Sequence, residues 1–137
     1  MTDNEQRTEL VGSNVSFSIA RVAPAVVVVV ISGRDVGEHG DRPLRALDNL
    51  LSEGSFELFV DARNTTGASI DVSNVWASWL RRHRDELHRI HMLTASRYVQ
   101  ITADFVRRFA DLGDSMLLYT DAAAFDEQLR AATRRPA

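Results

Sequence analysis

The sequence of 137 residues contains no cysteine and no lysine. Without cysteine the chain can form no disulfide, use no thiol nucleophile and bind no metal through sulfur. Without lysine it can use neither Schiff-base chemistry nor an amine as general base, because all 16 of its basic residues are arginine. A formal net charge of -3 gives no reason to expect nucleic acid as a partner.

Long apolar runs are also missing. The longest is AVVVVVI at 25–31, which is too short to cross a bilayer as a helix. The first ten residues, MTDNEQRTEL, are polar and unlike a signal peptide. We therefore predict a cytoplasmic protein without a transmembrane segment. A length of 137 residues, with 45% hydrophobic and 26% charged residues, suits one globular domain.

Apolar patterns predict five strands. VSFSIAR at 15–21 alternates apolar and polar residues, as a half-buried strand does. After Ala25, the run at 25–31 consists of β-branched residues and has no polar face, which is typical of a strand covered on both sides. Since only a short turn separates these two segments, we expect them to pair in antiparallel fashion. Further strands are predicted at 56–62, 88–94 and 115–120.

Helical spacing and capping residues predict four helices between and after these strands. They begin near Asp41, near Asp71 or Ser73, near Ser96 and near Asp121. Strands alternate with helices after the first hairpin, which indicates right-handed crossovers and parallel pairing. We predict a single α/β domain over 14–133. It has a mostly parallel five-stranded sheet, an antiparallel first strand, a frayed segment at 1–13 and a tail at 134–137.

The segment 63–73 is small and hydroxylated, and we predict a loop there. One interpretation is that its side chains only form turns and cap the next helix. The other is that it binds a partner or accepts a phosphate, because loops at the carboxyl ends of parallel strands are frequent binding sites. The candidate residues for this site, in the loop and the start of the helix, are Thr65, Thr66, Ser69, Asp71, Ser73 and Asn74.

Aromatic residues recur at helical spacing on the second and third predicted helices. We expect Trp76 and Trp79, and then Tyr98, Phe105 and Phe109, to face inward. Such stripes usually belong to the core. The alternative is that Trp76, Trp79, Tyr98 and Phe105 line an apolar pocket for a lipid-like ligand.

Titratable residues form no pattern typical of catalysis or of metal binding. On a strand, His88 and His91 would point to opposite faces. The glycines at 33, 37 and 40 match no nucleotide-binding motif, and no G-x-S-x-G motif is present. We therefore predict no enzyme activity, no catalytic residue, no cofactor and no metal.

Three segments carry a resemblance to a known domain family. They are LFVDAR at 58–63, WASWLRRHRDELHRIHMLT at 76–94 and TADFVRRFADLGDSMLLYTDAAAFDEQL at 102–129. With the order of strands and helices, they resemble the STAS domain and its small bacterial SpoIIAA-like group, from about Val15 to about Leu129. The fold of that group is similar to the lipid-binding Sec14 (CRAL-TRIO) domain. STAS domains occur in anti-sigma factor antagonists and in the cytoplasmic tails of sulfate transporters.

The resemblance also implies where a phosphate switch would lie. In the antagonists, a serine in an Asp-Ser-Ser-Gly run at the start of the helix after the third strand is phosphorylated by a partner kinase. Here the corresponding residues are SIDVS at 69–73. If Asp71 takes the place of the aspartate, the acceptor position is Val72, which cannot be phosphorylated, and Ser69 and Ser73 lie out of register. The resemblance therefore implies the fold but not this switch.

These observations predict a non-enzymatic regulatory interaction module. It would dock a protein, such as a kinase or an anti-sigma factor, through the loop after the third predicted strand and the start of the next helix. The alternative is a carrier or sensor of a small apolar ligand held between helices and sheet. A homodimer is a further alternative, because an exposed first strand could pair with a second copy.

Overall fold

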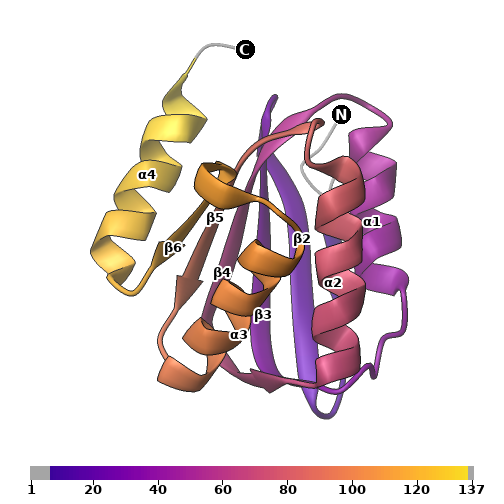
Figure 1. Ribbon diagram of the computed structural model, residues 1–137. Helices are drawn as coiled ribbons and strands as arrows, with labels where there is room; N and C mark the ends of the chain where they lie inside the picture. The colour runs from indigo at the N-terminus through magenta and orange to yellow at the C-terminus, as the bar shows by residue number, and fades with distance from the viewer. Residues whose placement is uncertain (1–6, 136–137) are drawn as a thin grey trace.

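The computed structural model describes residues 7–135 of the chain. Within this range the chain forms one sheet of six strands, which lie side by side in the order of the sequence (Figure 1). The strands are β1 (Arg7–Leu10), β2 (Val15–Ala23), β3 (Val26–Asp35), β4 (Phe56–Ala68), β5 (Leu87–Thr94) and β6 (Met116–Tyr119).

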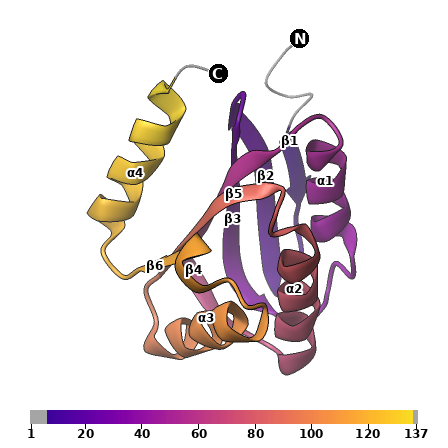
Figure 2. The ribbon, with the colours of Figure 1, turned by 45° about the horizontal axis from the view of Figure 1, so that its top comes forward.

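Helices cover the two faces of this sheet unequally. One face carries α1 (Arg42–Leu51), α2 (Ile70–His83) and α3 (Arg97–Phe109), and the opposite face carries α4 (Ala122–Arg134), as the two views in Figures 1 and 2 show. A short 3-10 helix, η2 (Gly113–Ser115), precedes β6. In the described part of the chain, no helix has both the length and the apolar character that a membrane span needs.

Strand pairing confirms the predicted mixed sheet. β2 is antiparallel to β1 and to β3, whereas the pairs β3–β4, β4–β5 and β5–β6 are parallel. The carboxyl ends of the four parallel strands therefore lie at the same edge of the sheet. The segments that leave these ends and the helices that follow them form the candidate sites described below.

The sheet has one strand more than predicted. β1 lies inside the segment 1–13, which we expected to be frayed, and it pairs residues 7–10 with residues 17–20 of β2. Its sequence, RTEL, is too short to show a period, but its ladder bonds to β2 and the burial of Leu10 (4% exposed) hold it in place. At the other end, Arg134 belongs to α4 rather than to a tail. Residues 1–6 and 136–137 lie outside the described residues.

Most of the loop predicted at 63–73 is in fact strand. β4 has 13 residues and continues through Ala68, because β3 also continues to Asp35 and pairs with it, with Gly33 opposite Thr65. The register shifts after Val30 and again after Gly33, so this extension is irregular. The sequence pattern does not reveal this extension, because its residues are mostly polar and its pairing with β3 depends on a distant part of the chain.

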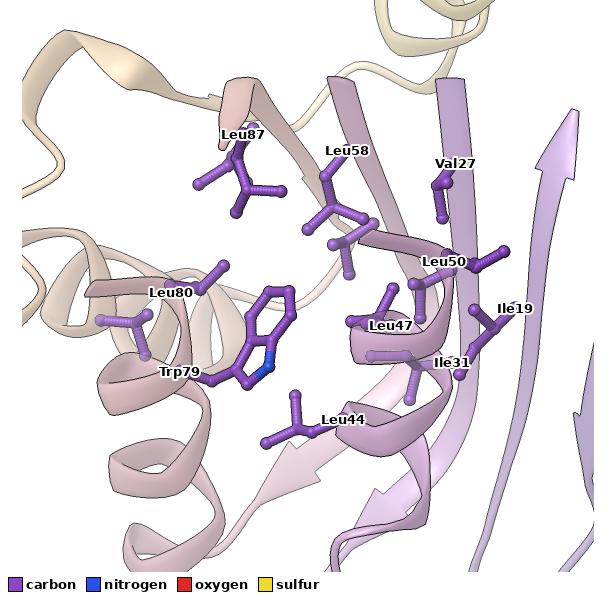
Figure 3. Close-up of a cluster of buried hydrophobic side chains, with 14 of the residues drawn as sticks. Ile19, Val27, Ile31, Leu44, Leu47, Leu50, Leu58, Trp79, Leu80 and Leu87 are labelled. Atoms are coloured by element: carbon purple, nitrogen blue, oxygen red, sulfur yellow. The ribbon is translucent and has the colours of Figure 1, made fainter. Parts of the chain in front are cut away.

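The larger core fills the space between the sheet and the three helices α1, α2 and α3 (Figure 3). Trp79 lies at its centre with 1% of its surface exposed, and its indole N–H donates to Asp48 Oδ1 at 2.8 Å. A smaller core beneath α4 contains Phe59 and Phe125. On that face Val28 and Val30 are only half-buried, so the run at 25–31 is not covered on both sides along its whole length.

Candidate functional site

The start of α2 lies at the carboxyl edge of the sheet and contains three of the six candidate side chains in its cap and first turn. Ser69 is the N-cap, and its Oγ accepts a hydrogen bond from the backbone N–H of Val72 at 3.2 Å. The hydroxyl of Ser73 donates to the carbonyl oxygen of Ser69 at 2.9 Å, and Ser73 is buried. Asp71, in the first turn, is exposed and lies where the helix dipole favours a negative charge.

The remaining candidates divide between the interior and the surface. Thr65 is buried, and its hydroxyl donates to the carbonyl oxygen of Ile31 at 3.0 Å, which ties β4 to β3. Thr66 and Asn74 are exposed. The structure thus leaves Thr66, Asp71 and Asn74 accessible to a partner, while Thr65 and Ser73 are enclosed and Ser69 is engaged in capping.

A cleft of about 380 Å³ lies next to the start of α2. One wall is the segment between β3 and α1, and the other is the first two turns of α2, which include Trp76. Two apolar side chains that line this cleft, Val36 and Val75, are each 51% exposed, and Ile70, which lies in the chain between the lining residues Ser69 and Asp71, is 79% exposed. Asp41 and Asp71 also line the cleft, so its rim is acidic.

Glu38 fixes the outer wall of the cleft. Its carboxylate accepts from the backbone N–H groups of Ser13, Asn14 and Val15, at 2.8, 3.0 and 3.1 Å. These bonds, that of Asn14 foremost, lower the pKa of Glu38 to about 2. The buried ring of His39 adds a contact of 2.8 Å between its Nε2 and the carbonyl oxygen of Val15. Sequence reasoning missed this anchor because its partners lie more than 20 residues away.

The four aromatic residues predicted to line one pocket are separated in the structure. Trp76 alone borders an apolar cavity of about 90 Å³ between α2, α3 and the sheet. Trp79 belongs to the core, whereas Tyr98 and Phe105 are 63% and 42% exposed. The expected inward orientation of the α3 stripe is therefore wrong. Smaller residues of α3 face the sheet instead, namely Val99, Ala103 and Val106.

A buried polar cluster lies on the α4 side of the sheet, where sequence reasoning predicted no convergence of titratable groups. His91 is 2% exposed and contacts the Tyr119 hydroxyl through Nδ1 (2.8 Å) and the Glu57 carboxylate through Nε2. Arg135 donates to the other Glu57 oxygen at 3.1 Å. The signal that could have found this cluster is a polar residue inside each of two apolar strands, Glu57 in β4 and His91 in β5.

The protonation of this cluster favours a structural role. Burial lowers the pKa of His91, so the ring is neutral, with Nε2–H donating to Glu57 and Nδ1 accepting from Tyr119. Burial also raises the pKa of Tyr119, which is the opposite of what an activated nucleophile needs. Phe59 stacks on the His91 ring at 4.1 Å and encloses it. Among the described residues, no three His, Asp or Glu side chains are placed to hold a metal ion.

Comparison of sequences does not place the chain in a family. No family model matches it, and no curated protein matches it either. The structure does have known counterparts. An uncharacterised protein of the DUF3478 family from Shewanella loihica, described as having a SpoIIAA-like fold, matches with a TM-score of 0.61 and 12% identity, over 85% of this chain and 94% of that one.

Two further structures are anti-sigma factor antagonists. One, from Mycobacterium paratuberculosis, matches with a TM-score of 0.60 and 11% identity, over 88% of this chain and 98% of that one. The other is SpoIIAA in its unphosphorylated form, with a TM-score of 0.56 and 21% identity, over 84% of this chain and 96% of that one. The chain therefore has a STAS/SpoIIAA-like fold, which confirms the fold expected from the sequence. At these identities the likeness establishes the fold alone.

Proposed function

We propose that this domain is a non-enzymatic regulatory module of the cytoplasm that docks a partner protein through the start of α2. The observation that carries the proposal is a group of exposed apolar side chains at this end of the helix: Val36 and Val75 line the cleft, and Ile70 is the first residue of α2. Burying such side chains against a partner is favourable at roughly 25 cal/mol per Å². Trp76, which also lines the cleft, is a side chain of the kind that dominates protein interfaces.

The chemistry of the rim indicates the kind of partner. Asp41 and Asp71 line the cleft, and Glu38 is exposed on the same segment as Val36. A complementary surface would therefore carry an apolar side chain surrounded by arginine or lysine. Two of the similar structures are anti-sigma factor antagonists, which supports an anti-sigma factor or a related kinase as the class of partner.

The proposal does not include a phosphate switch at the start of α2. Val72 lies where the resemblance places the acceptor, and neither neighbouring serine is free, since Ser69 caps the helix and Ser73 is buried. Adding a phosphate to Ser73 would require the first turn of α2 to open. Of the four hydroxyl groups considered, only that of Thr66 belongs to an exposed residue.

Site-specific photocrosslinking in the host organism tests the docking surface. A photoreactive phenylalanine analogue replaces Ile70 in one variant and the exposed Gln128 of α4, on the other face of the sheet, in a matched control. We expect a protein adduct from position 70 and none from position 128, and Asn74→Arg should remove it. Equal adducts at both positions, or no adduct at position 70, would contradict the proposal.

A second proposal, a carrier of a small apolar ligand, is supported by the cavity under α2 and α3. Its lining is apolar and includes Trp76, Met92 and Val106. At about 90 Å³ it has room for only a small apolar group, so a lipid-like ligand would require α3 to move away from the sheet. Native mass spectrometry of protein purified from its host distinguishes the two proposals. A bound mass that is lost on denaturation favours the carrier, and a bare chain favours docking.

A further inference from the structure

A second groove runs along the side of α3 that faces away from α2. It has a volume of about 870 Å³, and it is bordered by the connection from β5 to α3, by the outer side of α3 and by the end of β6. Volumes of this order are typical of sites for small molecules. The groove shares no lining residue with the cleft beside α2, so it is a separate site.

The hydroxyl of Thr94 marks one end of this groove. Thr94 is 1% exposed and lines the groove, and its Oγ1 is the one buried side-chain oxygen or nitrogen in residues 7–135 without a hydrogen-bond partner. A buried hydroxyl without a partner destabilises the folded chain, because it has lost its hydrogen bonds to water and gained none in exchange. Valine would fill the same volume in this strand without that cost. The hydroxyl is therefore free to donate to an acceptor that does not belong to the chain.

The N-terminus of α3 lies at the same end of the groove. Ser96 is the N-cap, and its Oγ accepts from the backbone N–H of Val99 at 3.5 Å. The N–H groups at the first positions of a helix have no partner within the helix, and the helix dipole makes this end positive. Arg97, the first residue of α3, and Gln100, one turn later, add side-chain donors that line the groove.

Positive charge extends along the rest of the groove. Arg107 and Arg108 line it further along α3, and both are held by Asp104, at 2.7 Å to Oδ1 and 3.2 Å to Oδ2. Three arginines against one aspartate make the groove basic in a chain whose net charge is -3. Such a local field attracts anions to the groove.

We propose that this groove binds the phosphate group of a small phosphate monoester. The phosphate would lie between Thr94, Arg97 and Gln100 at the start of α3, with the Thr94 hydroxyl donating to a phosphate oxygen. The organic part of the ligand would lie against Ile101 and Leu118, the apolar side chains of the groove. The monoester can be a free metabolite or a lipid headgroup, since the same donors recognise both.

The test uses the full-length, ¹⁵N-labelled chain in solution. Inorganic phosphate, glycerol 3-phosphate and, as a neutral control, glycerol are titrated separately while amide chemical shifts are recorded by NMR. We expect saturable shifts at Ser96, Arg97 and Tyr98 with both phosphates and none with glycerol. Co-sedimentation with vesicles of phosphatidic acid in phosphatidylcholine, against phosphatidylcholine alone, then shows whether a headgroup is the stronger ligand.

Two variants decide whether the groove is responsible. Arg97→Gln should weaken phosphate binding at least about fivefold, and Thr94→Val at least about threefold, as the loss of a hydrogen bond to a charged group predicts. Arg81→Gln, an exposed arginine of α2, is the matched control and should bind like the original chain. Thr94→Val should also raise the Tm of the ligand-free protein, because it removes the unpartnered hydroxyl.

The possible results separate clearly. Weakening by both variants but not by Arg81→Gln supports the proposal. Absence of saturable shifts at tens of millimolar phosphate overturns it, as does equal binding by all variants. If Arg97→Gln weakens binding and Thr94→Val does not, the arginine attracts anions unspecifically and the site built around Thr94 is refuted.

Discussion

The carboxylate of Glu38 controls the outer wall of the cleft beside α2. Its pKa of about 2 lies below the ordinary value of 4.5, so it stays ionised in the folded chain at a pH where the unfolded chain is already protonated. Its contribution to stability is therefore fully present above about pH 4.5 and is lost as the pH falls towards 2.

Glu38→Gln should lower the Tm at neutral pH and flatten the dependence of Tm on pH between 2 and 4.5. The amide offers one acceptor oxygen where the carboxylate offers two to the turn at 13–15. Thermal unfolding followed by circular dichroism across this pH range checks the prediction. Glu53→Gln, at an exposed position, is the control and should keep the original slope. Parallel curves for the original chain and Glu38→Gln would refute it.

His91 adds a second pH dependence in a higher range. Burial lowers its pKa from the ordinary value of 6.5, so below that pH the unfolded chain binds a proton that the folded chain does not. The contribution of the neutral His91 ring to the free energy of unfolding is thus fully present above about pH 6.5, and it decreases as the pH falls below that value. His91→Gln should be less stable at pH 7.5 but lose less stability between pH 7 and 5. His88→Gln, at an exposed position of the same strand, should retain the original slope.

At the scale of the element, the N-cap of α2 contributes measurably to the stability of the domain. Ser69→Ala removes the acceptor for the backbone N–H of Val72 and should cost about 1 kcal/mol of unfolding free energy. Ser78→Ala, in the exposed middle of the same helix, should change stability by less than about 0.5 kcal/mol. Urea unfolding of the two variants provides the comparison. A Ser69→Ala variant as stable as Ser78→Ala would show that the cap is dispensable.

The starts of the helices show how far the sequence predicts local structure. Capping at Ser96 and Asp121 is confirmed by hydrogen bonds from Val99 and Ala123. The start of α2 was predicted at Asp71 or Ser73, whereas Ser69 is its cap. The reason is that β4 reaches Ala68 by pairing with a distant, irregular part of β3. Asp41 lies at the N-cap of α1 but makes no side-chain capping bond. The sequence can therefore indicate where a cap lies, as at Ser96 and Asp121, whereas it does not show a strand extension that depends on a distant partner.

α3 illustrates a second limit of sequence reasoning. Both of its long sides contain apolar residues, and the larger ones were predicted to face the sheet. The structure places Val99, Ala103 and Val106 there, and the larger Tyr98, Ile101, Phe105 and Phe109 remain in solvent. Helical spacing reveals which residues share a side. Which side is buried depends on the room between helix and sheet, and this is set by the packing of the whole domain.

At the scale of the molecule, stability depends on two cores joined by one sheet. Phe125 of α4 is fully buried and packs edge-on against Phe59 and Tyr119, at 5.7 and 5.6 Å between ring centres. Phe125→Ala should cost about 3–5 kcal/mol, a large share of the roughly 5–15 kcal/mol typical of a domain. The exposed position Gln128 of the same helix provides the control, Gln128→Ala.

Chemical denaturation followed by hydrogen exchange measures this coupling. We expect a single transition shifted to lower denaturant, with amides of α2 on the opposite face losing protection together with those of α4. If α4 unfolds in a separate, earlier transition while α2 stays protected, the two cores are independent.

The position of α4 has a consequence for synthesis in the cell. It is the last helix of the described chain and the principal cover of Phe59, His91 and Leu93 on its face of the sheet. While the ribosome is still adding it, β4 and β5 can already pair and pack against α1, α2 and α3. For that interval the nascent domain presents an apolar surface with a histidine–glutamate pair at its centre. A chain that ends before residue 122 would keep this surface permanently and would be a natural substrate for chaperones and proteases.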